Sequence, residues 1–245
     1  MTEEYLIYSF YITLLLLVIN VVLVITKKQK LTRLVGIFIL LSSLFSYIGS
    51  YLVSGHLPVY DKFTTLPNIN FIAIFLSLLY NRTPEIKQKN INIAWPIIFI
   101  LYALVFLYKM EISSYYYMYD KFYVMLFFQL RITAIGIFVF AIINSISAIL
   151  DNTNSGNALN QRARNYTILG AVVFLCGEFS GSYWCFLWWG DSWHWTKGFF
   201  FASIMFLLSM VGSHLPKKYR KTPKQRAILN TIALGLIIVS YLLPH

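Results

Sequence analysis

The segment from Tyr183 to Thr196 contains the residue types best suited to binding chemistry in this chain. It reads Tyr-Trp-Cys-Phe-Leu-Trp-Trp-Gly-Asp-Ser-Trp-His-Trp-Thr and holds five of the six tryptophans. Indole rings are large, flat and apolar, so a cluster of them can stack against a planar apolar ligand. An aromatic belt at a membrane surface is the simpler interpretation for any single tryptophan. Five tryptophans interrupted by Gly190 and Asp191 exceed what a belt requires, which favours a ligand platform.

Two charged residues lie inside apolar stretches, where ionisable side chains are costly and usually paired. Arg131 follows the start of one stretch at Phe122 by nine residues, and Glu178 precedes the end of the next at Trp188 by ten residues. These positions place the two side chains at similar depth on neighbouring helices, so we predict an Arg131–Glu178 contact. The pair either only fixes helix packing or also leaves Arg131 able to bind a carboxylate of a ligand.

The composition places the chain in a membrane. Of its 245 residues, 58% are hydrophobic and only 12% are charged, and the mean hydropathy is +0.66. Soluble domains usually carry about 25% charged residues. A soluble enzyme, a secreted disulfide scaffold and a disordered chain are therefore excluded. Cys176 and Cys185 match no zinc or redox spacing and are interpreted as buried thiols.

A bilayer core about 30 Å thick needs about 20 mostly apolar residues per helix. Eight stretches meet or approach this length, although the third is short unless it begins near Phe63, before Pro67. They are Tyr5–Ile25, Leu34–Val53, Ile69–Tyr80, Ile91–Tyr108, Phe122–Leu150, Tyr166–Trp188, Phe199–Leu215 and Ala227–Leu243. We therefore predict an all-α, polytopic membrane bundle of about eight transmembrane helices, forming a single domain over residues 1–245.

The distribution of charge predicts the orientation of this bundle. Four alternate loops hold 15 of the 20 basic residues, and basic loops stay on the inner side of a membrane. Both termini and the tryptophan segment then lie outside. Topology explains the net charge of +11, so nucleic acid is not an expected partner, and the basic loop 217–226 is expected to meet anionic lipid. The polar stretch 151–157 is interpreted as a flexible inner link between two halves.

Targeting features are few. The chain starts with acidic residues and lacks the features of a signal or transit peptide. Its abundance of Phe, Ile, Tyr, Asn and Lys is typical of an AT-rich genome. These features favour an organelle-encoded protein of the mitochondrial inner membrane or a protein of a bacterial plasma membrane.

The stretch Trp189-Gly-Asp-Ser-Trp-His-Trp-Thr196 resembles the W-G-x-x-W-x-W-D motif of the WWD-domain family. Members of this family handle haem in cytochrome c maturation and include the haem lyase membrane subunit and the cytochrome c synthetases. The resemblance covers residues 169–214, because Gly170, Gly181 and Trp184 are similar to the upstream pattern and His214 lies eighteen positions after the motif. Thr196 replaces the motif's aspartate, and Lys-Gly-Phe replaces the proline and charged pair that usually follow.

The resemblance implies that haem b is bound non-covalently at the outer face. It implies a haem platform formed by Trp184, Trp189, Trp193 and Trp195, with Gly190 allowing a tight turn and Arg131 reaching a haem propionate. Candidate iron ligands are His56 and His245 in or beside outer loops, His194 within the motif, and His214 for a deeper site. His214 lies about 27 Å from Thr196 along a helix and cannot share an iron with an outer ligand. The outer loop 109–121, where the family carries a histidine, has none.

Two functions from different classes are consistent with these features. The first is a haem-handling component of cytochrome c maturation, which could form part of a haem lyase. Its expected partners are haem, apocytochrome c, other membrane subunits and lipids. The second is a degenerate family member that serves as a structural accessory membrane subunit of a respiratory-chain complex. The missing aspartate and flanking histidine favour the second, whereas the retained tryptophans and the spacing of His214 favour the first. A transporter would show paired broken helices, which the sequence lacks.

Overall fold

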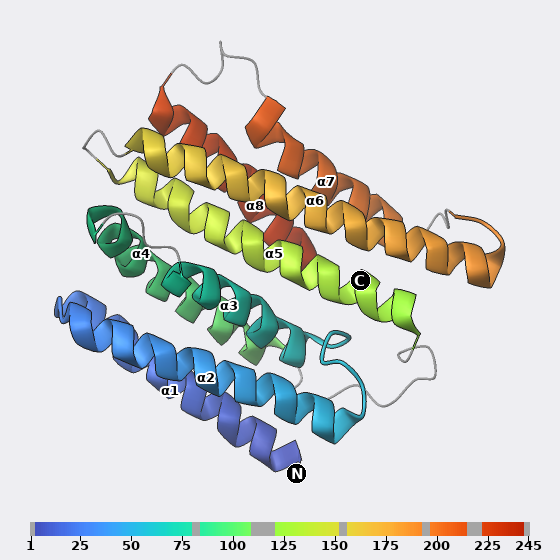
Figure 1. Cartoon of the computed structure of the whole chain (residues 1–245), viewed down its shortest axis with the longest axis horizontal. Coiled ribbons are helices and arrows are strands. Elements are labelled where there is room, and N and C mark those ends of the chain that lie inside the picture. The colour runs from blue at the N-terminus through green and yellow to red at the C-terminus, as the bar shows by residue number, and fades with distance from the viewer. Residues whose placement is uncertain are drawn as a thin grey trace. The chain divides into compact units, whose positions relative to one another are not determined.

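The structure, a computed structural model, describes residues 3–79, 84–108, 121–151, 156–192, 197–214 and 222–242. Within these ranges it is helical without strands, which confirms the all-α prediction. Each of the eight predicted stretches corresponds to one helix (Figure 1). The helices are α1 (Glu3–Ile25), α2 (Gln29–Ser54), α3 (Lys62–Leu79), α4 (Pro84–Ala103), α5 (Phe122–Ile149), α6 (Gly156–Trp189), α7 (Lys197–His214) and α8 (Pro223–Leu242), with a 3-10 turn η1 (Leu104–Leu107) after α4.

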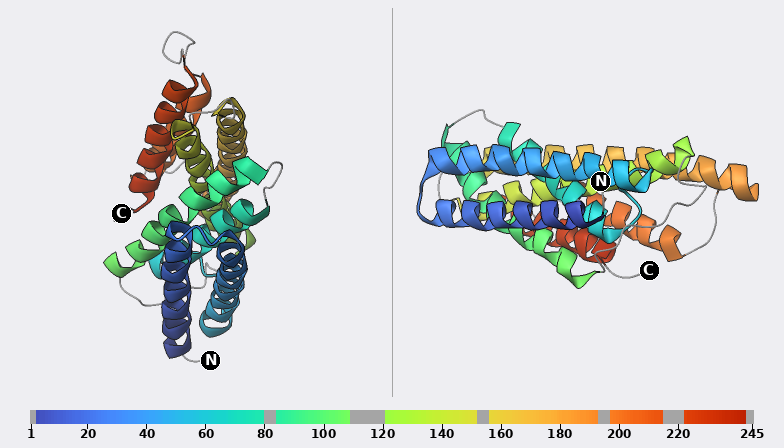
Figure 2. Two further views of the ribbon diagram at one scale, coloured as in Figure 1. Left: turned by 90° about the vertical axis from the view of Figure 1, so that its left-hand side faces the viewer. Right: turned by 90° about the horizontal axis from the view of Figure 1, so that it is seen from below.

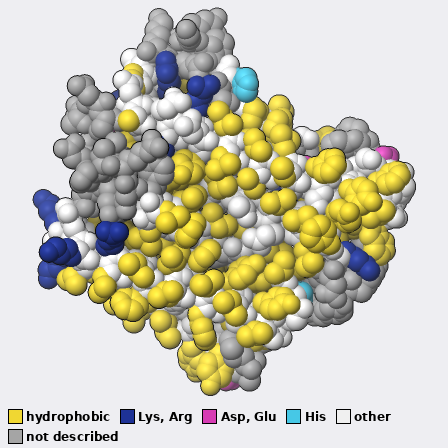
Figure 3. Space-filling view, viewed as in Figure 1, with side chains coloured by type: hydrophobic (Ala, Val, Ile, Leu, Met, Phe, Trp, Pro, Cys, Tyr) yellow, Lys and Arg dark blue, Asp and Glu magenta, His cyan; other side chains and the backbone are white. Residues whose placement is uncertain are grey.

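Six of these helices, α1, α2, α3, α5, α6 and α8, are long and apolar enough to cross a membrane. The apolar segments Asn92–Leu107 and Phe199–Val211 are shorter. Hydrophobic side chains dominate the face seen in Figure 3, and Lys and Arg side chains lie at its margins. The helices are thus compatible with an integral membrane protein, while the count of eight spans and the outer position of both termini remain predictions.

The chain forms two compact units, Met1–Lys121 and Phe122–His245. The division falls between Lys121 and Phe122, so the predicted link at 151–157 is wrong as a boundary. That stretch instead lies between α5 and α6, which pack against each other within unit 2. Because each unit has its own packed interior, each is described separately below.

Unit 1 is built from α1 to α4. Thr13 Oγ1 and Ser42 Oγ are 2.6 Å apart, and Ser9 bonds Ser46, so α1 and α2 run antiparallel. Figures 1 and 2 show the two helices side by side in each view. The third stretch does begin before Pro67, because Asp61 caps α3: its Oδ1 accepts a hydrogen bond of 2.7 Å from the Thr64 N–H.

Unit 2 is built from α5 to α8. In Figure 1 the ribbons of α5 and α6 lie alongside each other. Hydrogen bonds from Asn160 to the Pro223 carbonyl and from Thr167 to Asn230 join α6 and α8 at the same offset, so these two helices run parallel. Helix α6 begins ten residues earlier than predicted, at Gly156. Arg162, expected in a loop, is therefore a buried residue of its first turns.

Candidate functional site

The predicted contact between Arg131 of α5 and Glu178 of α6 is present. Arg131 Nε lies 2.5 Å from Glu178 Oε1, and Nη2 lies 2.8 Å from Oε2, so the guanidinium meets the carboxylate with two parallel bonds. The side chains are only 22% and 19% exposed. In such surroundings a charge-assisted pair of this geometry is strong and orients both groups. About one-fifth of the Arg131 side chain remains exposed at the surface of the helix pair.

A series of aromatic rings extends from this ion pair toward the end of α6. The Arg131 guanidinium carbon lies 4.0 Å from the centre of the Phe127 ring, a cation–π contact. The Phe127 and Trp184 rings are 6.0 Å apart, and the Trp184 and Trp189 rings are 5.7 Å apart, both tilted. The charged pair is thereby connected by ring contacts to the first tryptophan of the motif.

Two glycines allow these rings to pack between the helices. A Cβ atom on Gly181 would lie 2.5 Å from the Phe127 ring, and one on Gly170 would lie 2.6 Å from the Phe138 ring. No real side chain tolerates so short an approach without a shift of its neighbour. Ser180 adds a hydrogen bond of 3.0 Å from its hydroxyl to the Tyr123 carbonyl. The two glycines of the upstream resemblance therefore have a direct packing role.

Helix α6 ends where the motif begins. Gly190 adopts a left-handed backbone with φ of 71°, and its N–H donates to the Phe186 carbonyl at 3.0 Å. This is the usual αL end of a helix, for which glycine is favoured because it has no Cβ. Gly190 thus ends α6 in a conformation that favours glycine, while the turn of the motif loop beyond it stays a prediction. Trp189, at the last helical position, is half exposed, and Trp184 is partly buried with an indole N–H that finds no acceptor among the described residues.

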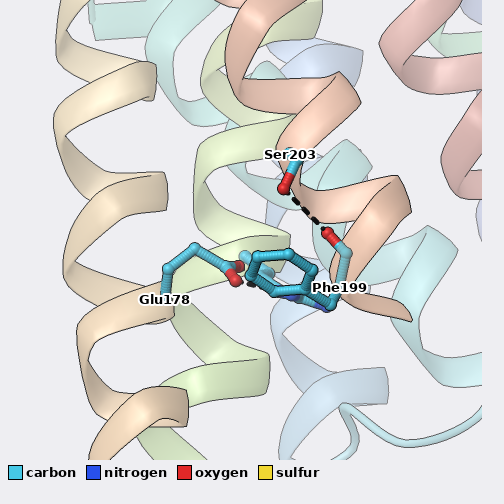
Figure 4. A network of polar contacts seen from close by, with 4 residues as sticks. Glu178, Phe199 and Ser203 are labelled. Atoms are coloured by element: carbon cyan, nitrogen blue, oxygen red, sulfur yellow. Dashed lines mark hydrogen bonds and ion pairs between the residues drawn. The ribbon is translucent and has the colours of Figure 1, made fainter. Parts of the chain in front are cut away.

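Helix α7 places an aromatic side chain near the ion pair. In Figure 4, Glu178 extends from α6, and the Phe199 ring extends from α7 toward its carboxylate. Ser203 Oγ donates a hydrogen bond of 3.0 Å to the Phe199 carbonyl within α7. Phe199 is half-buried, so α7 supplies apolar surroundings beside the ion pair.

The histidines lie in different parts of the chain. His56 is buried in unit 1, between α2 and α3, with Nδ1 3.0 Å from the Leu57 carbonyl oxygen. His214 is exposed in the last turn of α7, with Nδ1 3.2 Å from the Met210 carbonyl oxygen. Because α7 has 18 residues, His214 lies about 25 Å from the end of α7 that follows the tryptophans. His214 therefore lies at the far end of α7 from the tryptophan segment, and its separation from an outer iron site stays a prediction.

Four of the predicted site residues lie outside the described residues: Trp193, His194, Trp195 and His245. Among the residues that the structure does describe, no group of three or more His, Cys, Asp or Glu could hold a metal ion. In the described part of unit 2, the groups that could contact a planar ligand bearing a carboxylate are the Trp184 and Trp189 rings and the Arg131 guanidinium. An imidazole for the iron would have to come from His194, His245 or another part of the protein.

Phe127 is the central residue that sequence reasoning missed. Its ring contacts Arg131, Trp184 and the face of Gly181. One phenylalanine among many in an apolar helix has no distinguishing pattern. A count of positions could have found it, because Phe127 lies one turn before Arg131 and thus on the same face of α5.

Comparison with known proteins adds no relative to this picture. The chain matches no model of a known protein family and no curated protein.

Proposed function

We propose that this chain is a haem-handling membrane component of cytochrome c maturation, which presents haem b at the outer face of the membrane for attachment to apocytochrome c. The observation that carries the proposal is the connected set Arg131, Phe127, Trp184 and Trp189. It joins a cation suited to a carboxylate with aromatic faces suited to a planar ring, at the end of α6 where the motif begins. The resemblance of residues 169–214 to WWD-domain proteins supports the same function.

The residues have separate tasks in this proposal. Trp184, Trp189, Trp193 and Trp195 bind the flat face of the ligand, and Arg131 binds a propionate while Glu178 holds the guanidinium in place. Bound haem supplies the iron and the vinyl groups that react with cysteine thiols of the apocytochrome. His194, His245 and His56 are the candidate outer ligands, and His214 belongs to a deeper site. Other membrane subunits and lipids surround the chain in a mitochondrial inner membrane or a bacterial plasma membrane.

The test is haem content. Detergent-purified protein is expected to show a reduced α-band and near-stoichiometric b-type haem in a pyridine haemochrome assay. Removing one stacking ring, in Trp189→Ala or Trp193→Ala, should weaken binding about fivefold, since such a contact contributes about 1 kcal/mol. Phe179→Ala is the matched control, because Phe179 is an exposed aromatic residue of the same helix outside the motif. Equal haem content in all four proteins would contradict the platform.

A second function is favoured by one observation, the packing role of Gly170 and Gly181 against Phe138 and Phe127. These glycines are explained by helix packing alone, as a structural accessory subunit of a respiratory-chain complex would require. In that case the tryptophan face would meet lipid or a neighbouring subunit. A folded preparation without haem that co-purifies with other respiratory subunits would support this function over the first.

A further inference from the structure

Unit 1 contains a pocket that the proposed function does not use. It is lined by residues of all four helices, including Phe10 of α1, Ser43 of α2, Phe63 of α3 and Tyr102 of α4. The pocket lies toward the end of unit 1 at which α1 and α3 begin and α2 ends, since Leu6 and Ser50 also line it. The centres of water molecules can occupy about 20 Å³ of it.

Two hydroxyl groups that line the pocket have no hydrogen-bond partner among the described residues. They are Ser43 Oγ and Tyr102 Oη. Ser43 is 2% exposed and Tyr102 is 0% exposed. Thr13 lies close to Tyr102 and donates to the Ser9 carbonyl, but its hydroxyl and the Tyr102 hydroxyl do not meet in hydrogen-bonding geometry. Both orphan hydroxyls are therefore removed from bulk solvent.

The neighbouring hydroxyls of α2 behave differently. Ser46 donates to the Ser42 carbonyl at 3.0 Å, and Ser50 donates to the Ser46 carbonyl at 2.8 Å. Such bonds to the preceding turn are the usual way in which serines inside apolar helices satisfy their hydrogens. Ser43 lacks this bond although it lies on the same helix. Its hydroxyl is thus left for something inside the pocket.

The phenol of Tyr102 is held in a fixed place. Its ring stacks on that of Phe10, with centres 4.8 Å apart and planes at 13°. Phe63 lies against the other ring, with its centre 5.8 Å from that of Phe10. A rigid stack of this kind presents the hydroxyl in one direction and prevents it from turning to a carbonyl of its own helix.

The pocket is suited to water. Space of about 10–15 Å³ is enough for one molecule, which needs two to four polar partners. Ser43 and Tyr102 supply two, and Thr64 and Asn68 also line the pocket. None of its described lining residues is charged, so the occupant must be small, neutral and able to form hydrogen bonds. We propose that unit 1 binds one or two ordered water molecules in this pocket, held by the hydroxyls of Ser43 and Tyr102.

Three further buried residues of unit 1, which do not line this pocket, also have polar atoms without a described partner. Asn20 of α1, Asn70 of α3 and Trp95 of α4 are almost fully buried, and each has a side-chain polar atom without a partner among the described residues. Asn20 lies two helical turns beyond Thr13, toward the opposite end of unit 1. Amides and indoles without partners are rare in an apolar interior.

The test is the accessibility of water to an introduced thiol, measured in the full chain in native membranes. Ser43→Cys is made in a Cys176→Ala/Cys185→Ala background and transferred to D2O, and exchange of its S–H group is followed by the infrared S–H stretch. Two controls on α2 match it. Ile39→Cys is fully buried one turn away on the same face, and Leu44→Cys faces outward at a neighbouring depth. Exchange needs contact with water, so the thiol of Ser43→Cys should exchange at least about tenfold faster than that of Ile39→Cys.

S–H exchange of Ser43→Cys no faster than that of Ile39→Cys would overturn the proposal. A second measurement decides the matter if the cysteine variant does not fold. Tyr102→Phe should lower the melting temperature, because it removes a partner of bound water. In a dry pocket the same change would remove an unpaired hydroxyl and raise the melting temperature. Tyr11→Phe, at an exposed position on α1, is the control, and neither measurement depends on haem.

Discussion

Arg131 of α5 and Glu178 of α6, 47 positions apart in the chain, meet in a two-bond ion pair whose guanidinium also covers the Phe127 ring. The pair therefore joins an electrostatic contact to the aromatic series of the motif. Each side chain is about one-fifth exposed, so neither charge is fully hydrated when its partner is removed. The ion pair consequently joins α5 to α6 and also places a cation beside aromatic faces.

The ion pair predicts an asymmetric response to substitution. Removing one partner, in Arg131→Met or Glu178→Met, leaves the other charge in apolar surroundings. We expect a loss of about 2–3 kcal/mol, somewhat below the value for a fully buried pair, because both side chains retain some contact with solvent. The measurement is the melting temperature of each purified variant in detergent.

The matched control is the double variant Arg131→Met/Glu178→Met, which removes both charges and keeps the volume. Replacing a pair by apolar residues is often close to neutral, so the double variant should melt nearer to the wild type than either single variant does. A double variant less stable than both single variants would contradict this account.

The ion pair was predictable from sequence because the two charges lie at similar depth on neighbouring apolar helices. An unpaired charge at that depth is costly, which favours helix rotations that bring Arg131 and Glu178 together. The helix positions were predictable because the length of each apolar stretch can be counted directly in the sequence. The start of α6 was missed because the first residues of this helix form no apolar run. Its buried residues there, Leu159 and Ala163, are separated by three polar residues.

The ring contacts were not predictable in this way. Which of the many phenylalanines of α5 meets Gly181 depends on the rotation of each helix about its axis, and small differences in packing set that rotation. The division into two units has the same origin. It depends on which helices share an interior, and the polar stretch at 151–157 resembles a linker although it joins the two most closely packed helices.

The close approach at Gly181 predicts that even a methyl group is harmful there. Gly181→Ala would place Cβ 2.5 Å from the Phe127 ring and should cost about 1–3 kcal/mol through displacement of that ring. Gly235→Ala, in α8, meets nothing within 4 Å and should stabilise by about 0.5–1 kcal/mol, because alanine is the better helix former. Melting temperatures that move in the same direction for both variants would disprove the steric explanation.

The left-handed backbone of Gly190 predicts a different dependence on residue type. A Cβ atom at this position meets no neighbour, so the cost is confined to the backbone. Gly190→Ala should lose about 1–2 kcal/mol, whereas Gly190→Asn should lose less, since asparagine adopts this conformation more readily. Thermal denaturation of the two variants is the measurement, and an equal loss in both would contradict the conformational reason.

Asn230 of α8 links three helices of unit 2. Its Nδ2 donates to Ser145 Oγ of α5 at 2.9 Å, and its Oδ1 accepts from Thr167 Oγ1 of α6 at 3.3 Å. Asn230→Leu should therefore destabilise by about 1–2 kcal/mol. Thr231→Val is the control, because the Thr231 hydroxyl bonds a carbonyl of its own helix, that of Ala227. Equal melting temperatures for the two variants would show that the link contributes little.

Haem content of the Arg131→Met/Glu178→Met variant separates the two roles of the ion pair. If the pair only fixes helix packing, a double variant that melts like the wild type must also retain the same amount of haem. If Arg131 binds a propionate, the double variant keeps its fold but loses a charge-assisted contact of about 1.5–3 kcal/mol, which corresponds to a tenfold or greater loss of affinity. We expect this second result, measured by haemochrome titration at equal protein concentration. Trp184→Phe in the same assay tests the neighbouring ring, because it keeps an aromatic face but removes the unpaired indole N–H. A comparable loss of haem affinity in this variant would indicate that the ligand contacts Trp184 as well as Arg131.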